Sequence, residues 1–294
     1  MTGATDKPAA EVAIDEGLVR GLLRSQHPDL AELPLVPLGS GWDNELLRLG
    51  DELLVRLPRR EAAAALVGNE QRWLPSLAPV LPLPVPVPVR VGTPDATYPW
   101  PWTIAAHLPG RSAVRAAPDD EVAAARTLGR FLVALHRPAP PDAPANPYRG
   151  IPLAGRDALT RGWIEQLAAE IDAPGVLAAW EEACAVELWD GPPVWLHGDL
   201  HPDNLLVDDG RIAAVIDFGD LTAGDPATDL LCGWMLFGPA GRDALRAATG
   251  VDDATWARGR GWALAIGLAY LAHSSEDAAY ARVGSATLAA VLTG

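Results

Sequence analysis

Trp195-Leu-His-Gly-Asp-Leu-His-Pro-Asp-Asn204 is the most informative stretch of this 294-residue chain. It places Asp199 and Asn204 at a D-x-x-x-x-N spacing, in an irregular segment that predicts a loop. A short apolar run over residues 212–216 follows, and Asp217 stands directly after it. An aspartate at the end of a strand holds its carboxylate at a rigid edge, where the chain leaves the sheet. The stretch therefore predicts a loop and a strand pair that present two carboxylates and one amide.

These three side chains suit phosphoryl transfer. Hard cations such as Mg²⁺ prefer oxygen ligands, so the Asn204 amide and the Asp217 carboxylate suit a metal that bridges phosphates. Asp199 then remains free to accept the proton of a hydroxyl group. Protein kinases divide the same tasks among a catalytic-loop aspartate, an asparagine and a second aspartate. The pattern predicts transfer of a phosphoryl group from a nucleoside triphosphate to a hydroxyl.

The motifs resemble those of the aminoglycoside phosphotransferase family, which includes macrolide kinases and choline-kinase-like enzymes. The resemblance rests on His197-Gly-Asp-Leu-His-Pro-Asp-Asn204, on Ile216-Asp-Phe-Gly-Asp220 and on Gly224-Asp-Pro-Ala-Thr-Asp229. It is weaker over the N-terminal part and fades toward the C-terminus. It implies an α+β protein-kinase-like bilobal fold, with a strand-rich N-terminal lobe and a mainly helical C-terminal lobe.

The resemblance also implies roles for single residues. Asp199 takes the position of the catalytic base, and Asn204 and Asp217 take the positions that bind Mg²⁺. ATP or GTP is then the phosphoryl donor, and a small-molecule hydroxyl is the acceptor. His197 and Asp220 are expected to support the site structurally rather than to react.

The N-terminal lobe should supply the phosphate contacts. Gly39-Ser40-Gly41 lies at the first predicted hairpin turn, where family members cover the phosphates, although by itself such a triplet is more typical of an ordinary turn. Arg56 stands in a strand that carries a lysine in most of the family, and macrolide-kinase-like members are similar in having arginine there. Arginine can still bind phosphate bidentately. Glu70 on the next helix is its expected partner, the alternative being a solvated helix face.

The segment over residues 104–110 resembles the family hinge. There, backbone groups around Ala105 and His107 are expected to bind the nucleotide base, and apolar Ile104 and Leu206 to sandwich it. Ordinary core packing of these two side chains is the alternative. The predicted division is an N-terminal nucleotide-binding lobe over 1–103, this hinge, and a catalytic and substrate-binding lobe over 111–294.

Local patterns predict the elements. Short apolar runs separated by turns predict strands over 35–39, 45–49, 52–57, 89–92 and 102–108, and an Ala-rich segment predicts one helix over 60–77 that stops at Pro75 and Pro79. Alternating prolines over 81–89 predict an extended connector. Three- and four-residue spacing predicts a helix that Pro118 and Asp119 begin, and others over 157–171, 176–189 and beyond Asp225.

Composition narrows the class of protein. A net charge of −15 argues against nucleic acid as a partner. No stretch is long and apolar enough to span a membrane, and residues 1–10 lack the apolar core of a signal peptide, so we expect a cytoplasmic protein. Cys184 and Cys232 are far apart and predict free thiols. Nothing in the sequence indicates the oligomeric state.

The sequence leaves open the identity of the acceptor molecule and two alternative functions. Acidity favours an aminoglycoside-like aminated natural product, with macrolides as the alternative, and the many tryptophans of the C-terminal half predict core rather than pocket. His197, Asp199, His201 and Asp203 also permit a zinc-dependent hydrolase, which would leave Asn204 unexplained. A degenerate kinase fold that binds nucleotide without turnover has Arg56 as its support.

Overall fold

The computed structural model describes residues 8–273 and 277–293, which form two compact units. Unit 1 comprises the chain up to Pro79, Pro84–Leu108 and Asp217–Gly219. Unit 2 comprises Val80–Leu83, Pro109–Ile216 and the chain from Asp220 onward. The functional division at residues 103 and 110 stays a prediction, and residues 1–7 of the stretch that lacks a signal-peptide core lie outside the described residues.

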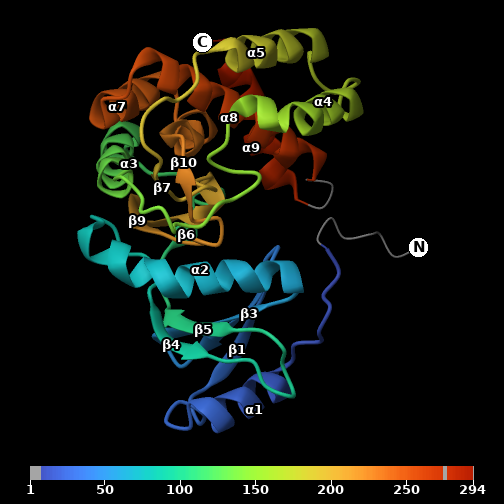
Figure 1. The fold of residues 1–294 in the computed structure, drawn as a ribbon, viewed down its shortest axis with the longest axis vertical. Coiled ribbons are helices and arrows are strands. Elements are labelled where there is room, and N and C mark those ends of the chain that lie inside the picture. The colour runs from blue at the N-terminus through green and yellow to red at the C-terminus, as the bar shows by residue number, and fades with distance from the viewer. Residues whose placement is uncertain (1–7, 274–276, 294) are drawn as a thin grey trace. The chain divides into compact units, whose positions relative to one another are not determined.

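A five-stranded antiparallel sheet forms the centre of unit 1 (Figure 1). Its order is β1 (Leu35–Ser40), β2 (Asn44–Leu49), β3 (Leu53–Pro58), β5 (Trp102–Ala106) and β4 (Pro88–Gly92). The hairpin of β2 and β3 turns at Gly50, whose φ of 60° favours glycine, as the Gly-Asp pair predicts. Alternate side chains of the sheet fill a core that contains Leu47, Val55 and Ile104.

Two helices lie on opposite sides of this sheet in Figure 1: α1 (Glu16–Gln26) and α2 (Glu61–Leu77). The expectation of a single helix in this part of the chain is therefore wrong. The Asp15 carboxylate caps α1 by accepting the Leu18 N–H at 2.8 Å. Three side chains at helical spacing, Val19, Leu22 and Leu23, are buried against the sheet.

Helix α2 does not stop at Pro75, as expected, but contains it. Proline removes one backbone hydrogen bond, yet Leu74 and Leu77 on either side of it are buried. Their packing keeps the last turn helical, since tertiary contacts supply most of the stability of a helix. A short 3₁₀ turn, Ala78–Val80, follows.

Two small antiparallel sheets in unit 2 hold both ends of the segment between residues 196 and 205. Strand β7 (Val194–Leu196) pairs with β10 (Thr222–Gly224). Strand β8 (Leu205–Asp208) lies between β9 (Arg211–Val215) and the short β6 (Arg111–Ser112). The loop–strand–turn–strand prediction for this region is confirmed, with β7 as an added strand. The loop is thus fixed by a sheet at each end.

Helices make up most of unit 2. Helix α8 is buried on nearly every side, with Trp262, Ala263, Leu264, Ala265 and Ile266 in the core, as befits the central helix of a bundle. Trp180 and Trp262 have no exposed surface, in line with the prediction that these tryptophans form core. The helices are α3 (Glu121–Leu135), α4 (Asp157–Gln166), α5 (Ala173–Ala185), α6 (Cys232–Leu236), α7 (Pro239–Thr249), α8 (Asp253–Ala272) and α9 (Ala278–Leu292), with 3₁₀ turns at Leu153–Arg156, Pro202–Asn204 and Pro226–Leu231.

Capping residues correct several expected boundaries. Helix α3 begins after Asp120, whose carboxylate accepts the Ala123 N–H at 2.9 Å, and not at Pro118. The helix expected over 157–171 ends at Gln166. The next one begins at Ala173 because the Asp172 carboxylate accepts the Gly175 N–H at 3.1 Å, and it ends before Trp189.

The expected α+β class is confirmed, with a strand-rich first unit and a mainly helical second one (Figure 1). Cys184 and Cys232 are both free thiols, as predicted. Across the described part of the chain, none of the helices combines the length and apolar character that a membrane span requires.

Candidate active site

Asp199 lies on the loop that leaves β7, directly after Gly198. The φ of Gly198 is 85°, a left-handed conformation that glycine adopts without strain. A Cβ at this position would lie 2.3 Å from the carbonyl oxygen of Asp220. Only glycine satisfies both conditions, so Gly198 is what lets the loop turn and present Asp199.

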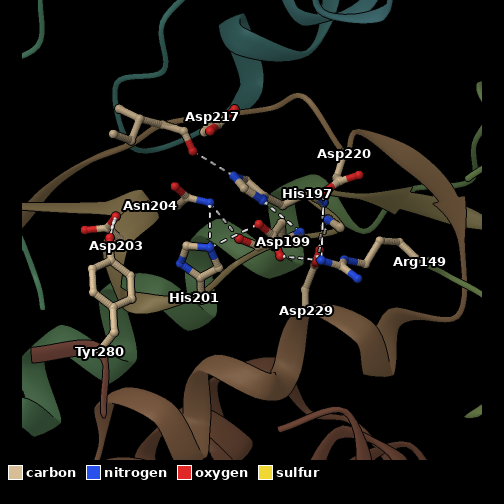
Figure 2. A network of polar contacts seen from close by, with 12 residues as sticks. Arg149, His197, Asp199, His201, Asp203, Asn204, Asp217, Asp220, Asp229 and Tyr280 are labelled. Carbon is tan, nitrogen blue, oxygen red and sulfur yellow. Dashed lines mark hydrogen bonds and ion pairs between the residues drawn. The ribbon is translucent and has the colours of Figure 1, made fainter. Parts of the chain in front are cut away.

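A buried carboxylate, Asp229, holds the start of this loop (Figure 2). Its Oδ2 accepts the backbone N–H of His197 at 2.9 Å, and its Oδ1 accepts that of Gly198 at 2.8 Å. Nε2 of His136 lies 3.0 Å from Oδ2. The side chain has no exposed surface, so these contacts take the place of the hydrogen bonds to water that the carboxylate loses on burial. The backbone before Asp199 is therefore rigidly placed.

Two side chains hold the Asp199 carboxylate itself. Nη2 of Arg149 donates to Oδ1 at 2.8 Å, and Nε2 of His201 lies 3.0 Å from Oδ2 (Figure 2). Burial by itself would raise the pKa of Asp199, but His201 and Arg149 outweigh it and hold that pKa well below its usual range. The carboxylate is thus ionised at neutral pH. Because 22% of the side chain remains exposed, an acceptor can reach it.

His197 ties the loop to the strand that follows it. Its Nε2 lies 2.9 Å from the carbonyl oxygen of Ile216, and its Nδ1 accepts the Asp199 N–H at 3.2 Å. Nδ2 of Asn204 donates to the carbonyl oxygen of Asp199 at 2.9 Å. These contacts link the loop to the next strand and occupy the nitrogen of the Asn204 amide, while the supporting role expected for His197 stays a prediction.

Asp220 is a second carboxylate that contacts Arg149, and it also accepts a hydrogen bond from Asn146. Nδ2 of Asn146 donates to its Oδ1 at 2.6 Å, and Nη2 of Arg149 lies 3.9 Å from its Oδ2. Arg149 therefore stands between two carboxylates, those of Asp199 and Asp220 (Figure 2). One guanidinium partly offsets the repulsion between the two negative charges.

In unit 1, Arg56 forms ion pairs with two carboxylates. Nη1 lies 3.1 and 2.9 Å from the two carboxylate oxygens of Glu70, and Nη2 lies 3.2 Å from Oδ1 of Asp217. Arg56 and Glu70 are buried, and burial raises the pKa of the Glu70 carboxyl even though Arg56 opposes the shift. The pairing of Arg56 with Glu70 that the sequence suggested is thus present.

Asp217 combines strain with exposure. Its φ of 60° lies in the left-handed region, which costs a residue with a Cβ about 1 kcal/mol and is concentrated at functional sites. About half of its side chain is exposed, at 52%, although Arg56 contacts one oxygen. Asp217 thus has one oxygen paired with Arg56, and its carboxylate remains accessible to a ligand.

The other residues expected around a nucleotide occupy varied environments. Gly39 has a φ of 116°, Ser40 donates to the Glu45 carboxylate, and the Gly41 N–H donates to the Asn44 carbonyl oxygen at 2.8 Å, so two hydrogen bonds close the turn. Ile104 and Ala105 have no exposed surface and lie within β5, while the His107 N–H donates to the Glu52 carbonyl oxygen at 2.7 Å. Leu206 in unit 2 is buried in β8. Their contacts with a nucleotide stay predictions.

The four residues of the zinc alternative do not converge on one point. Asp203 accepts hydrogen bonds from Ser112 Oγ and Tyr280 Oη, and Figure 2 shows it turned toward Tyr280. His197 is used to hold Ile216. Over residues 8–273 and 277–293, no group of three or more His, Cys, Asp and Glu side chains is placed to bind a metal ion. The structure thus offers this alternative no support.

A match to a family model decides the family. Residues 34–262, most of the chain, match the phosphotransferase enzyme family. The chain belongs to this family. The resemblance read from the loop motifs is confirmed.

Individual relatives agree with this membership. The chain is 26% identical over 161 residues to an aminoglycoside 3'-phosphotransferase of Escherichia coli, a match that covers 52% of this chain and 59% of that relative. The chain thus spans about three-fifths of the length of that relative. The GDP complex of aminoglycoside 2'-phosphotransferase-IIIa superposes with a TM-score of 0.69 at 19% identity, covering 95% of this chain and 99% of the other. Macrolide 2'-phosphotransferase MphH of Brachybacterium faecium gives 0.60 at 23% identity, covering 92% and 97%.

Several residues of this phosphotransferase family member were missed by sequence reasoning. Asp229 is the last residue of the motif Gly224-Asp-Pro-Ala-Thr-Asp229, and its place in that motif could have indicated a role at the site. Arg149, Asn146 and His136 carry no local signal. Their partners, Asp199, Asp220 and Asp229, lie 50, 74 and 93 residues away along the chain, in that order.

Proposed function

We propose that this chain transfers the γ-phosphoryl group of ATP or GTP to a hydroxyl of an aminoglycoside-like aminated natural product. The observation that carries the proposal is the Asp199 carboxylate, which is partly exposed and contacted at both oxygens, by Arg149 and His201, the same two groups that lower its pKa. Such a group suits a general base for an acceptor hydroxyl. Membership of the phosphotransferase enzyme family supports the same reaction class.

In the proposed reaction, the acceptor oxygen forms a bond to the γ-phosphorus. The bond between that phosphorus and the β,γ-bridging oxygen breaks, and the nucleoside diphosphate leaves. The hydroxyl proton passes to a carboxylate oxygen of Asp199. Because the transition state of phosphoryl transfer is loose, little proton transfer is needed early, and orientation of the hydroxyl matters more than basicity. A carboxylate of low pKa is adequate for that task.

The residues at the two predicted metal positions fit Mg²⁺. Asp217 offers a half-exposed carboxylate. The amide nitrogen of Asn204 faces the Asp199 carbonyl, which leaves its amide oxygen for a ligand. Oxygen donors with few protein ligands suit Mg²⁺, which takes its remaining ligands from phosphates and water. Asn204 and Asp217 would hold the ion, which neutralises phosphate charge when bound.

For the nucleotide, we propose that Arg56, held by Glu70, contacts the phosphates and that Gly39-Ser40-Gly41 covers them. Backbone groups of Ala105 and His107 would bind the base, with Ile104 and Leu206 near it. Ion pairs with two carboxylates, those of Glu70 and Asp217, stabilise the positive charge of Arg56. Because nucleoside triphosphates are held in the cytoplasm, we place the reaction there.

The net charge and the activities of relatives support the proposed acceptor class. A net charge of −15 attracts cationic molecules over a long range and repels nucleic acid. The relatives include aminoglycoside phosphotransferases and a macrolide phosphotransferase. A macrolide, with one amine on a large apolar ring, is therefore the second candidate acceptor.

Mass spectrometry tests the proposal directly. The chain is incubated with Mg²⁺ and ATP or GTP and a panel of amino-sugar antibiotics and macrolides, and each acceptor is examined for a gain of about 80 Da, the mass of one phosphoryl group. The Asp199→Asn variant is the matched control. A gain on an amino sugar supports the first acceptor class, and one on a macrolide alone supports the second. A thermal shift with nucleotide but no product from any acceptor would favour the degenerate-kinase alternative.

A further inference from the structure

We infer that Arg149 is a positioning residue for the proposed reaction: it fixes the plane of the Asp199 carboxylate, so that one oxygen stays directed at the acceptor hydroxyl. The inference rests on the proposed function. It concerns a residue that lies outside every motif of the sequence and belongs to the connection between α3 and α4.

The first step is how the carboxylate is held. Arg149 contacts Oδ1 of Asp199 at 2.8 Å, and His201 contacts Oδ2 at 3.0 Å. One contact leaves a carboxylate free to rotate about the Cβ–Cγ bond, a broad torsion in aspartate. Contacts on both oxygens stop that rotation. Each oxygen has further lone pairs, so the acceptor hydroxyl can still approach.

The second step is how Arg149 is itself held. The chain just before it is fixed at both backbone groups of Tyr148: the Tyr148 N–H donates to Oδ1 of Asn146 at 2.9 Å, and the Tyr148 carbonyl accepts from Nη1 of Arg156 at 2.9 Å. Asn146 in turn donates to Asp220 at 2.6 Å. The segment that carries Arg149 is thus fastened to the same group of side chains that it contacts.

The residue after Arg149 is fixed by a close backbone crossing. Gly150 has a φ of 69°, and its N–H donates to Oγ1 of Thr228 at 3.2 Å. A Cβ on Gly224 would lie 2.1 Å from the Gly150 carbonyl oxygen, and one on Gly150 would lie 2.9 Å from a methyl carbon of Leu196. Only glycine fits at these two positions. Arg149 is therefore placed by rigid backbone on both sides.

The third step concerns charge. Arg149 is only 15% exposed and stands between Asp199 and Asp220, so a single guanidinium serves both carboxylates. Nη2 makes both contacts, and the planar guanidinium that carries it keeps a fixed geometry that the flexible, compact ammonium of lysine lacks. Loss of these contacts would let Asp199 move, and a misplacement of about 1 Å at a reacting group can reduce the rate by about 100-fold.

Steady-state kinetics of Arg149→Ala and Arg149→Lys, with the acceptor identified by mass gain, test the inference. Arg149→Ala should lower kcat by about 10- to 100-fold while the KM for nucleotide stays near that of the wild type. The kcat of Arg149→Lys should lie between that of Arg149→Ala and that of the wild type. Added guanidinium ion should restore part of the kcat of Arg149→Ala, which a purely structural contact does not predict. Arg161→Ala is the matched control, because Arg161 also bridges two carboxylates, Asp157 at 2.9 Å and Glu181 at 3.1 Å, but is exposed.

The outcomes separate this inference from the proposed function. If the wild type phosphorylates an acceptor and Arg149→Ala keeps more than half of its kcat, the inference is overturned and the proposed function stands. A loss of kcat that guanidinium does not restore also overturns it. If Arg149→Ala does not fold, Arg149→Lys decides, and wild-type kcat in that variant overturns the inference. Absence of transfer by the wild type to any acceptor overturns the proposed function, and the inference with it.

Discussion

Asp229 fastens Gly198 in place: its Oδ1 accepts the Gly198 N–H at 2.8 Å, across 31 residues of sequence. The same carboxylate accepts the His197 N–H and lies beside His136. A side chain with no exposed surface thus determines where the backbone places Asp199. The position of the proposed base is thus set at the residue that precedes it.

We expect Asp229→Asn to lower the free energy of unfolding by about 1–3 kcal/mol, the cost of leaving a buried donor unsatisfied. An amide keeps one acceptor oxygen but turns its NH₂ group toward the second backbone N–H. Urea denaturation measures the change, and Asp208→Asn on the exposed end of β8 is the control, expected to change it by less than about 0.5 kcal/mol. Equal stability of the two variants would show that the buried contacts contribute nothing.

Asp199→Asn should lower kcat by about 10²- to 10⁴-fold, the usual cost of removing a general base. Nucleotide affinity should stay close to that of the wild type, because Asp199 is not among the proposed nucleotide or metal contacts. Rapid-quench kinetics and nucleotide titration measure the two quantities on the same preparation. A variant that keeps most of the wild-type kcat would remove Asp199 from the role of base.

Asp217→Asn should weaken the magnesium dependence of nucleotide binding, and Asn204→Ala should do so to a smaller degree. Asp217 supplies the one formal charge on the metal in the proposed scheme. Asparagine also tolerates the left-handed conformation of residue 217, so the variant tests charge rather than backbone strain. Nucleotide is titrated with and without magnesium. The metal role of Asp217 would be lost if its variant responded to magnesium as the wild type does.

Arg56→Ala should raise the KM for nucleotide and lower kcat, while Arg56→Lys keeps part of the activity because the charge remains and the fork is lost. Glu70→Ala should have a weaker effect of the same kind, since Asp217 still contacts Arg56 at 3.2 Å. Residues that act through one contact show coupling of about 0.5–3 kcal/mol in a double-mutant cycle. Fully additive effects would contradict the pairing as a functional unit, and an unchanged KM in Arg56→Ala would point to another cation.

Local sequence was enough for much of the site. Asp199, Asn204 and Asp217 lie within 19 residues of one another, on a loop and a strand pair that turn residues and apolar runs predict from the sequence. Spacing within a short loop constrains which side chains can meet, because few backbone torsions separate them. The hairpin of β2 and β3 and the helix expected after residue 60 were predicted for the same reason.

Local sequence failed where burial overrides it. Pro75 remains inside α2 because Leu74 and Leu77 pack on either side of it, and α1 was missed although Asp15 caps a helical run of apolar residues. Ile104 has no exposed surface, and an apolar residue in a strand reads the same whether it lines a pocket or fills a core. Such choices depend on what packs against a residue.

Sequence by itself indicated the family and the reaction class of the chain, and it placed Asp199 and Asn204 on one loop. Tertiary structure alone decided that Arg149 meets Asp199, that Asn146 meets Asp220 and that His136 meets Asp229, across 50, 74 and 93 residues. The segment that carries Asn146 and Arg149 also crosses close to Gly224 at Gly150. No short-range pattern records such contacts, because each partner is brought to the other by the whole fold and by none of its neighbours in the chain.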